Sequence, residues 1–255
     1  MSHDLHRYDY ESFLGAAHAA RPEYFGDAWC GGLDRSETLH CAAYGDDGNV
    51  PRAHDVMDKL QGSIETPRAL WRRNVGGCYP VVAEHLQGIP DAMRERRRLR
   101  DASHPITVYA SIMASCTVSA EDMMKRGIAI LALVLKLQAI RPIKLYAVCP
   151  WVYSTLLIEI PTRPLSIAHA AFCLSHPAFF RRLGHEVLFS TGDRCTAMAD
   201  DPSVPARLGM RPTDLYVGTG VSSLDWTGGA KSEYATVLQD PVGWINETIR
   251  RYAHL

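Results

Sequence analysis

The sequence predicts an α/β protein with a mostly parallel sheet, helices on both faces of that sheet, and a helical appendage before it. From residue 105 onward, short β-branched and aromatic runs alternate with helical patterns, which is the order of a parallel sheet. A long helix between two of these runs is apolar all round and must be buried. No strand pattern occurs before about residue 65. We therefore expect a helical appendage over residues 1–64 and an α/β domain over residues 65–255.

The first 64 residues predict three short helices separated by turns. Residues that cap or break helices bound them, such as Ser36 before the second helix and Gly62 after the third. The predicted helices cover 9–20, 36–43 and 51–60. Together they make up the expected appendage.

The segment before residue 105 holds the densest charge in the chain. Residues 68–75 predict a strand, and residues 80–86 predict a short helix that ends at Gly88. Residues 91–101 then carry five arginines against Glu95 and Asp101. Two interpretations of this cluster stay open: a solvated helix face without a function, or a contact surface for phosphates.

The central unit of the predicted fold is a strand, a helix and a second strand between residues 105 and 150. Ile106–Ile112 is β-branched, aromatic and short, as expected for a strand. Ser119 can cap the following helix, whose Ile128–Leu135 stretch lacks polar residues. The helix must end before Pro142, and residues 143–149 predict the next strand.

The remaining residues predict three more strands and three more helices. The strands are expected at 155–160, 186–189 and 214–217. The helices are expected at 165–174, at 177–183 with Gly184 as the stop, and from Pro241 to residue 252. Proline suits the first position of that last helix, where its missing N–H has no intrahelical partner in any case.

Composition excludes several classes of protein. A net charge of −1 gives no overall attraction to nucleic acid or anionic membranes. The 7 cysteines form no CxxC pair, which favours reduced thiols in a cytosolic compartment over a disulfide framework. The N-terminus has no signal-peptide pattern, and the central apolar run is far shorter than the ~20 residues of a membrane span. We expect no membrane partner.

Motifs of common enzymes are missing from the sequence. Neither a GxGxxG nor a GxxxxGK[ST] phosphate loop is present, and no GxSxG nucleophile motif occurs. Among 11 histidines, the closest cluster with a cysteine is formed by His169 and His176 around Cys173. Structural zinc needs four ligands, and this group offers three without a second nearby pair. We therefore expect no metal, no cofactor and no catalytic residue.

Clusters of arginine beside aromatic residues are the candidate functional site. In single-stranded nucleic acid binders, bases stack on aromatic rings while arginines follow the phosphates. Each aromatic residue can equally belong to the core. The candidate nucleic-acid-binding residues are Trp71, Arg72, Arg73, Arg94, Arg96, Arg97, Arg98, Arg100, Arg181 and Arg182.

The turn after the first core strand resembles part of a von Willebrand factor A domain, which opens with a strand, a Ser-rich turn, a long helix and a strand. That family's turn reads Asp-x-Ser-x-Ser and holds a magnesium-type ion together with a later Thr and Asp. Here Ser111 and Met113 replace the Asp and the first Ser, and only Ser115 fits. The later strand 214–217 resembles the family's strand-loop, but Thr219 stands where an acid is expected. A hard divalent cation needs carboxylate ligands, so the resemblance implies a retained scaffold without its metal.

A second resemblance covers most of the chain. The stretches Trp71–Gly77 and His85–Met93, with Gly31-Gly32 and Lys125–Gly127, look like a group of uncharacterised bacteriophage proteins. This resemblance implies a phage-encoded protein that works in the cytoplasm of an infected bacterium. Its motifs are not specific to any reaction.

These observations lead to two functional hypotheses. The first is a non-enzymatic phage protein that binds nucleic acid, preferably single-stranded DNA, as an accessory factor in transcription or replication. The alternative is an ion-free, A-domain-like module in phage assembly or host takeover that binds a phage or host protein, such as a polymerase. Binding to oligonucleotides distinguishes the two hypotheses.

Overall fold

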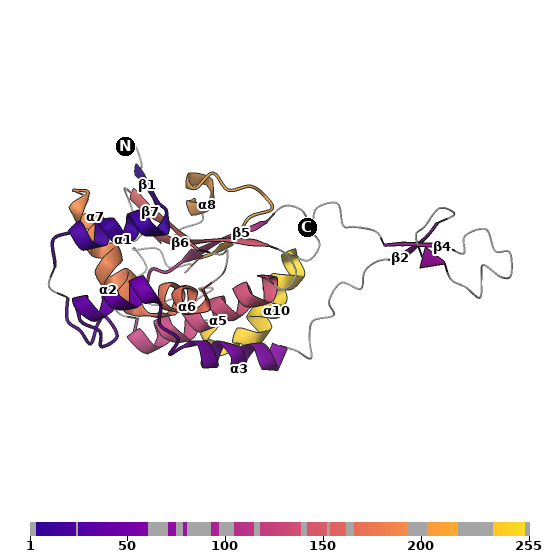
Figure 1. Ribbon diagram of the computed structural model, residues 1–255, viewed down its shortest axis with the longest axis horizontal. Helices are drawn as coiled ribbons and strands as arrows, with labels where there is room; N and C mark the ends of the chain where they lie inside the picture. The colour runs from indigo at the N-terminus through magenta and orange to yellow at the C-terminus, as the bar shows by residue number, and fades with distance from the viewer. Residues whose placement is uncertain are drawn as a thin grey trace.

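The protein has an α/β fold built on one five-stranded sheet (Figure 1). The computed structural model describes residues 4–23, 25–60, 71–74, 79–80, 93–96, 105–114, 118–138, 142–151, 154–161, 166–192, 203–218 and 237–252. The strands of the large sheet are β1 (Asp4–Tyr8), β5 (Ile106–Ser111), β6 (Ile143–Pro150), β7 (Ser154–Ile160) and β8 (Leu215–Val217).

The large sheet is mixed but mostly parallel, as predicted. Its strand order is β1-β7-β6-β5-β8. β5 pairs in parallel with β6 and with β8, and β1 pairs in parallel with β7. Only β6 and β7, which follow each other closely in the chain, are antiparallel among these pairs. The crossover from β5 to β6 runs through the long central helix, as a parallel pair requires.

Several of the helices begin at local capping residues. Their bounds are α1 (Tyr10–Ala19), α2 (Arg35–Tyr44), α3 (Val50–Leu60), α5 (Ala120–Gln138), α6 (Ile167–Ser175), η2 (Phe179–Gly184), α7 (His185–Ser190), α8 (Val204–Arg207) and α10 (Pro241–Tyr252). The Ser119 hydroxyl accepts a hydrogen bond from the Asp122 amide at 3.0 Å, so the predicted cap of α5 is confirmed. The cap of α2 is Asp34 rather than Ser36, because Asp34 and Glu37 form a reciprocal capping box.

The buried helix α5 lies at the centre of the core. Its Ile130, Leu131 and Leu133 have no exposed surface. Figure 1 shows α5 on the same side of the sheet as α3, α6 and α10. On the opposite face, residues of the α8 region, Val204 and Leu208, pack against Val148 and Leu157 of the sheet. The large helices therefore cover one face, and α8 lies on the other.

The N-terminal residues were expected to be purely helical, and this prediction is wrong. Asp4–Tyr8 forms the edge strand β1 and pairs with β7 from Ser154 to Ile158. Helix α1 adds Phe13, which is fully buried and lies 5.3 Å from the Phe179 ring by centroid. Within the described residues 4–60, the chain thus belongs to the main sheet and its core. The five residues of β1 include an aspartate, a histidine and an arginine. Their strand pattern is therefore too weak to be recognised without the partner strand.

The strand predicted at residues 186–189 is also wrong, because this stretch is helix α7. It continues directly from η2, which is a π-helix, and Gly184 lies inside the continuous helix instead of ending it. Nearly every residue of this helix is buried. A short apolar run that is buried on all sides has no periodicity that separates a strand from a helix.

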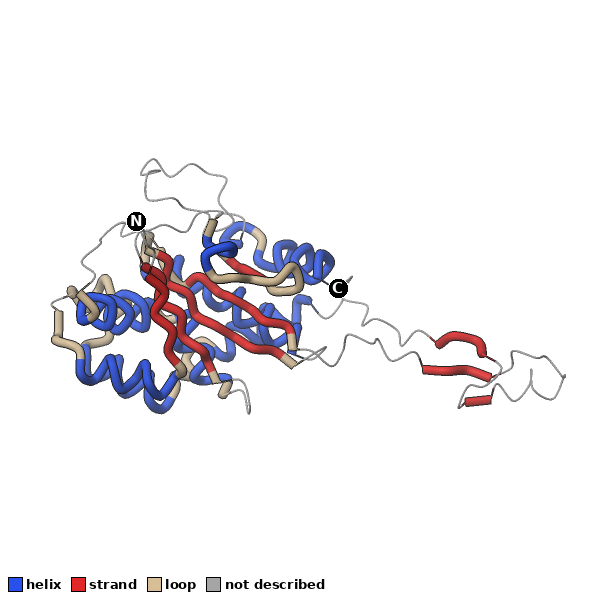
Figure 2. The backbone as a smooth tube through the Cα atoms, turned by 90° about the horizontal axis from the view of Figure 1, so that it is seen from above, coloured by secondary structure: helices blue, strands red, loops and turns tan. Residues whose placement is uncertain are grey.

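A separate three-stranded antiparallel sheet precedes β5 in the chain. It comprises β2 (Trp71–Asn74), β3 (Tyr79–Pro80) and β4 (Met93–Arg96), in the order β2-β4-β3. Figure 2 shows these strands apart from the five strands of the large sheet. The predicted strand at 68–75 is confirmed at 71–74. Residues 93–96 form a strand instead of the helix face considered above, and Pro80, expected to begin a helix, lies in β3.

No helix among the described residues is long and apolar enough to cross a lipid bilayer.

Candidate functional site

Two of the predicted arginine clusters come together in the small sheet. Antiparallel pairing sets Trp71 opposite Arg96 and Arg73 opposite Arg94. On the other side of β4, Tyr79 of β3 is the register partner of Arg94. The spacing of these residues along the chain did not indicate that they would lie opposite each other. We call the paired residues 71–74 and 93–96 the β2–β4 ladder.

The register of the β2–β4 ladder divides its residues between two faces. Directly opposed residues of an antiparallel pair share a face, and successive residues alternate. Trp71, Arg73, Arg94 and Arg96 therefore belong to one face of the ladder. Arg72 belongs to the other face, where its register partner is Glu95. The predicted residues Arg97, Arg98 and Arg100 lie outside the described part of the chain.

Arg181 was expected to contact nucleic acid, but the structure places it in the core. It is 1% exposed. Its guanidinium donates hydrogen bonds to the main-chain oxygens of Trp29 at 2.9 Å and Val118 at 2.6 Å, and it lies 4.7 Å from the centroid of the Trp29 ring. A guanidinium that is buried and bonded in this way cannot reach a phosphate backbone.

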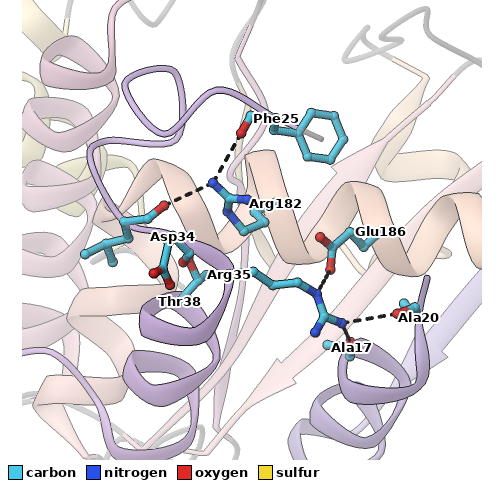
Figure 3. Close-up of polar contacts among 9 residues, drawn as sticks. Ala17, Ala20, Phe25, Asp34, Arg35, Thr38, Arg182 and Glu186 are labelled. Carbon is cyan, nitrogen blue, oxygen red and sulfur yellow. Dashed lines mark hydrogen bonds and ion pairs between the residues drawn. The ribbon is translucent and has the colours of Figure 1, made fainter. Parts of the chain in front are cut away.

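Arg182 has the same structural role and is likewise corrected. Its Nη2 lies 2.8 Å from Asp27 Oδ1 and donates to the carbonyl oxygen of Leu33 at 3.1 Å. It donates more weakly, at 3.4 Å, to the carbonyl oxygen of Phe25 (Figure 3). Together, Arg181 and Arg182 attach the segment after α1 to helix η2. These contacts join residues about 150 positions apart, so no local spacing could reveal them.

An ion pair that sequence reasoning missed lies beside Arg182. Arg35 Nε donates to Glu186 Oε2 at 2.9 Å, while its Nη2 donates to the carbonyl oxygens of Ala17 and Ala20 (Figure 3). Glu186 has no exposed side-chain surface. Burial raises the pKa of Glu186, and the Arg35 guanidinium partly opposes this shift. The pair connects α1, α2 and α7.

His185, next to this pair, is enclosed by aromatic rings. The rings of Trp151 and Phe180 have centroids 5.1 Å and 4.7 Å from the imidazole centroid, and those of Phe25, Trp29 and Phe189 lie within 6 Å. Burial in this cluster lowers the pKa of His185 to about 4. The imidazole is therefore neutral near pH 7 and acts as a core ring.

Arg126 lies at the carboxyl ends of β5 and β8, where Ser111 begins the turn compared above with a metal-binding turn. Its Nη1 donates to the Ser111 carbonyl oxygen at 2.6 Å. Its Nη2 donates to the carbonyl oxygen of Gly218 at 3.1 Å, with Val217 O at 3.4 Å. Ser115 lies outside the described residues. A buried cation of the protein itself thus bridges the ends of these two strands.

His169 and Cys173, two members of the histidine–cysteine cluster, make hydrogen bonds to other groups of the protein core. The His169 ring nitrogens lie 2.6 Å from Ser166 Oγ and 3.0 Å from the Ala43 oxygen. Burial raises the pKa of the Cys173 thiol to about 12, and its Sγ donates to the Tyr10 hydroxyl at 3.4 Å. In the described part of the chain, no three His, Cys, Asp or Glu residues are arranged to hold a metal ion.

Comparison with known proteins identifies a family. Residues 6–140 match the family described as a domain of unknown function, DUF7192. Neither the curated proteins nor the solved structures contain a match to the chain. Because residues 6–140 are more than half of its 255 residues, the chain belongs to the DUF7192 family.

Proposed function

We propose that this protein binds nucleic acid, preferably single-stranded DNA, through the β2–β4 ladder. The observation that carries this proposal is the register, which sets Arg73 opposite Arg94 and Trp71 opposite Arg96. Like charges directly opposite each other on one face of a sheet are destabilising. A polyanion on that face would neutralise both arginines and remove this cost.

The residue types on this face suit single-stranded nucleic acid. Arginine pairs with phosphate oxygens through its planar fork of donors. A tryptophan beside arginines offers a ring on which an unpaired base can stack, a contact worth about 1–3 kcal/mol per base. On the opposite face, the register sets Arg72 opposite the acidic residue Glu95. The two faces thus differ in their attraction for phosphate.

We further propose that the large sheet is an A-domain-like scaffold without its metal, in a phage protein that acts in the bacterial cytoplasm. The order of β5, α5 and β6, with β8 beside β5, supports the scaffold part of this proposal. So does Arg126, whose guanidinium already bridges the ends of β5 and β8. A guanidinium at these strand ends would also suit the second hypothesis, an ion-independent module that binds a protein such as a polymerase. The phage origin and the cytoplasmic location follow from the resemblance of the sequence.

Fluorescence anisotropy with labelled single- and double-stranded oligonucleotides, at several salt concentrations, tests the proposal. Arg73→Ala and Arg94→Ala should weaken binding, and each should reduce the log–log salt slope by about 0.7 for every phosphate that the variant no longer neutralises. Trp71→Ala should weaken binding with nearly the same slope, because stacking releases few counterions. Arg72→Ala is the matched control and should bind like the wild type.

Two results would contradict this function. Equal losses of affinity in Arg72→Ala and Arg73→Ala would mean that the face assigned by the register is not the binding face. Absence of binding to either oligonucleotide at low salt would reject nucleic acid as the partner. The protein-binding hypothesis would then be tested by capture from infected cells.

A further inference from the structure

A row of tyrosines crosses the large sheet on the face opposite α5. The register places Tyr216 of β8 beside Tyr109 of β5, and Tyr109 beside Tyr146 of β6, so the three residues share a face. All three pack against Val148, Leu157 and the α8 region, and each stays partly exposed. Figure 2 is seen from this side and shows the strands of the large sheet in view.

Tyr109 and Tyr146 form a stack on two neighbouring strands. Their ring centroids are 5.2 Å apart, and the ring planes differ by 14°. Aromatic rings favour such parallel, offset contacts, so a further flat ring can extend the stack. Burial raises the pKa of Tyr109, and it raises the pKa of Tyr146 to about 12. Both phenols are therefore uncharged near neutral pH and do not repel an anion.

Three cationic side chains lie around this stack. The charge of Arg7, on β1, opposes the rise in the pKa of both phenols, which places it near the two rings. Lys144 is exposed and precedes the β6 tyrosine by two residues, on the same face. The side chain of Arg211 is 63% exposed, whereas that of its ion-pair partner Asp214 is 3% exposed. Glu159 adds an exposed carboxylate, which accepts a hydrogen bond from the β6 tyrosine at 3.2 Å. The exposed charge around the stack is thus mainly positive.

We propose that the tyrosine stack binds an unpaired base of a single-stranded nucleic acid, while Arg7, Lys144 and Arg211 contact the flanking phosphates. This proposal rests on the ligand class of the proposed function but uses no residue of the β2–β4 ladder. In one common class of RNA-binding domain, aromatic residues on a sheet face stack two or three bases. An acidic protein segment would also meet the three cations, but it would leave the stacked rings unused.

Two labelled probes of equal charge test this site by fluorescence anisotropy at low salt. One is an oligothymidylate, and the other is an abasic oligonucleotide of the same length, which has the phosphates without the bases. The measurements use the full chain with Trp71→Ala, Arg73→Ala and Arg94→Ala, called the ladder variant, so that the tyrosine site is observed by itself. The ladder variant should still bind oligothymidylate.

Adding Tyr146→Leu to the ladder variant removes a ring and keeps an apolar side chain. It should weaken oligothymidylate binding at least about fivefold and leave binding of the abasic probe unchanged. Tyr44→Leu is the matched control, because Tyr44 lies on α2 and is 72% exposed; it should change neither affinity. Lys144→Gln should weaken binding of both probes and make the log–log salt slope shallower by about 0.7.

The proposal is overturned if the ladder variant binds no oligothymidylate, or if Tyr146→Leu leaves its affinity unchanged or weakens both probes equally. Displacement of oligothymidylate by polyglutamate of equal charge as readily as by unlabelled oligothymidylate would assign the face to an acidic protein segment instead. Should Tyr146→Leu fail to fold, the exposed change Lys144→Gln decides, and an unchanged affinity and salt slope would reject the site. If the ladder variant binds as tightly as the wild type while Tyr146→Leu acts as expected, the proposed function of the ladder fails and the tyrosine site stands.

Discussion

Replacing Gly127 with alanine is a sharp test of how tightly α5 packs. A Cβ atom at this position would lie 2.1 Å from the Leu174 carbonyl oxygen and 2.3 Å from the Ser175 Cα. Both atoms are main chain of α6, so no side chain can rotate away. The two helices would have to separate by roughly 1.4 Å for the Leu174 oxygen to reach an ordinary contact distance of about 3.5 Å.

The two energetic effects of Gly127→Ala have opposite signs. Overpacking of a core costs about 1–3 kcal/mol and occasionally more. The better helix propensity of alanine returns about 1 kcal/mol. Because rigid backbone opposes the new atom, we expect the upper part of the overpacking range and a net loss of about 2 kcal/mol. For a chain of this size that loss lowers the melting temperature by about 4–8 °C.

Gly15→Ala is the matched control for this experiment. Gly15 lies in the middle of α1, is exposed, and has no atom within 4 Å of an added Cβ. Here only helix propensity acts, so the melting temperature should rise by about 2–4 °C. Thermal and urea unfolding followed by circular dichroism measure both changes. If Gly127→Ala is as stable as the wild type while Gly15→Ala shows its rise, the close approach of α5 and α6 is refuted.

Further predictions concern the same core and the strand ends. Gly127→Leu should aggregate or unfold, whereas Lys136→Ala on the same helix should unfold like the wild type. Melting curves with Mg²⁺, Mn²⁺ or EDTA should coincide, because Arg126 already donates to the carbonyls at the ends of β5 and β8; a metal-dependent rise that Ser115→Ala abolishes would contradict this. The folded pKa of His185, about 4, lies below its unfolded value of about 6.5. In this pH range the unfolded chain binds a proton at His185 that the folded chain does not bind, so the free energy of unfolding should fall by up to about 3 kcal/mol as pH drops from 6.5 to 4. Urea unfolding at several pH values measures this loss, and the His185→Leu variant should lack it. Among the four cysteines of the described residues, maleimide labelling of the native protein, read by peptide mass mapping, should modify the half-buried Cys41 before the buried Cys173; prior reaction of Cys173 would show that the core opens.

Local chemistry allowed the sequence alone to predict the central unit of the fold. The strands around Val108 and Leu145, the capped helix between them and the closing helix α10 all have signals within a few residues of themselves. Those signals are β-branched runs, hydroxyl or carboxylate caps and prolines at helix ends. Gly127 in the long apolar helix was a further local signal, and its contact with α6 explains why a side chain is missing there.

Only the tertiary structure decided where the charges of the candidate site lie. Arg181 and Arg182 look like a surface pair in sequence, yet their donors are taken by carbonyl and carboxylate oxygens from distant segments. The pairing of Arg35 with Glu186 and the register of Arg73 with Arg94 likewise join residues whose separation follows no helical or strand period. Local patterns report backbone preference and burial. Which buried arginine meets which oxygen depends on chain segments that come together only when the whole core has formed.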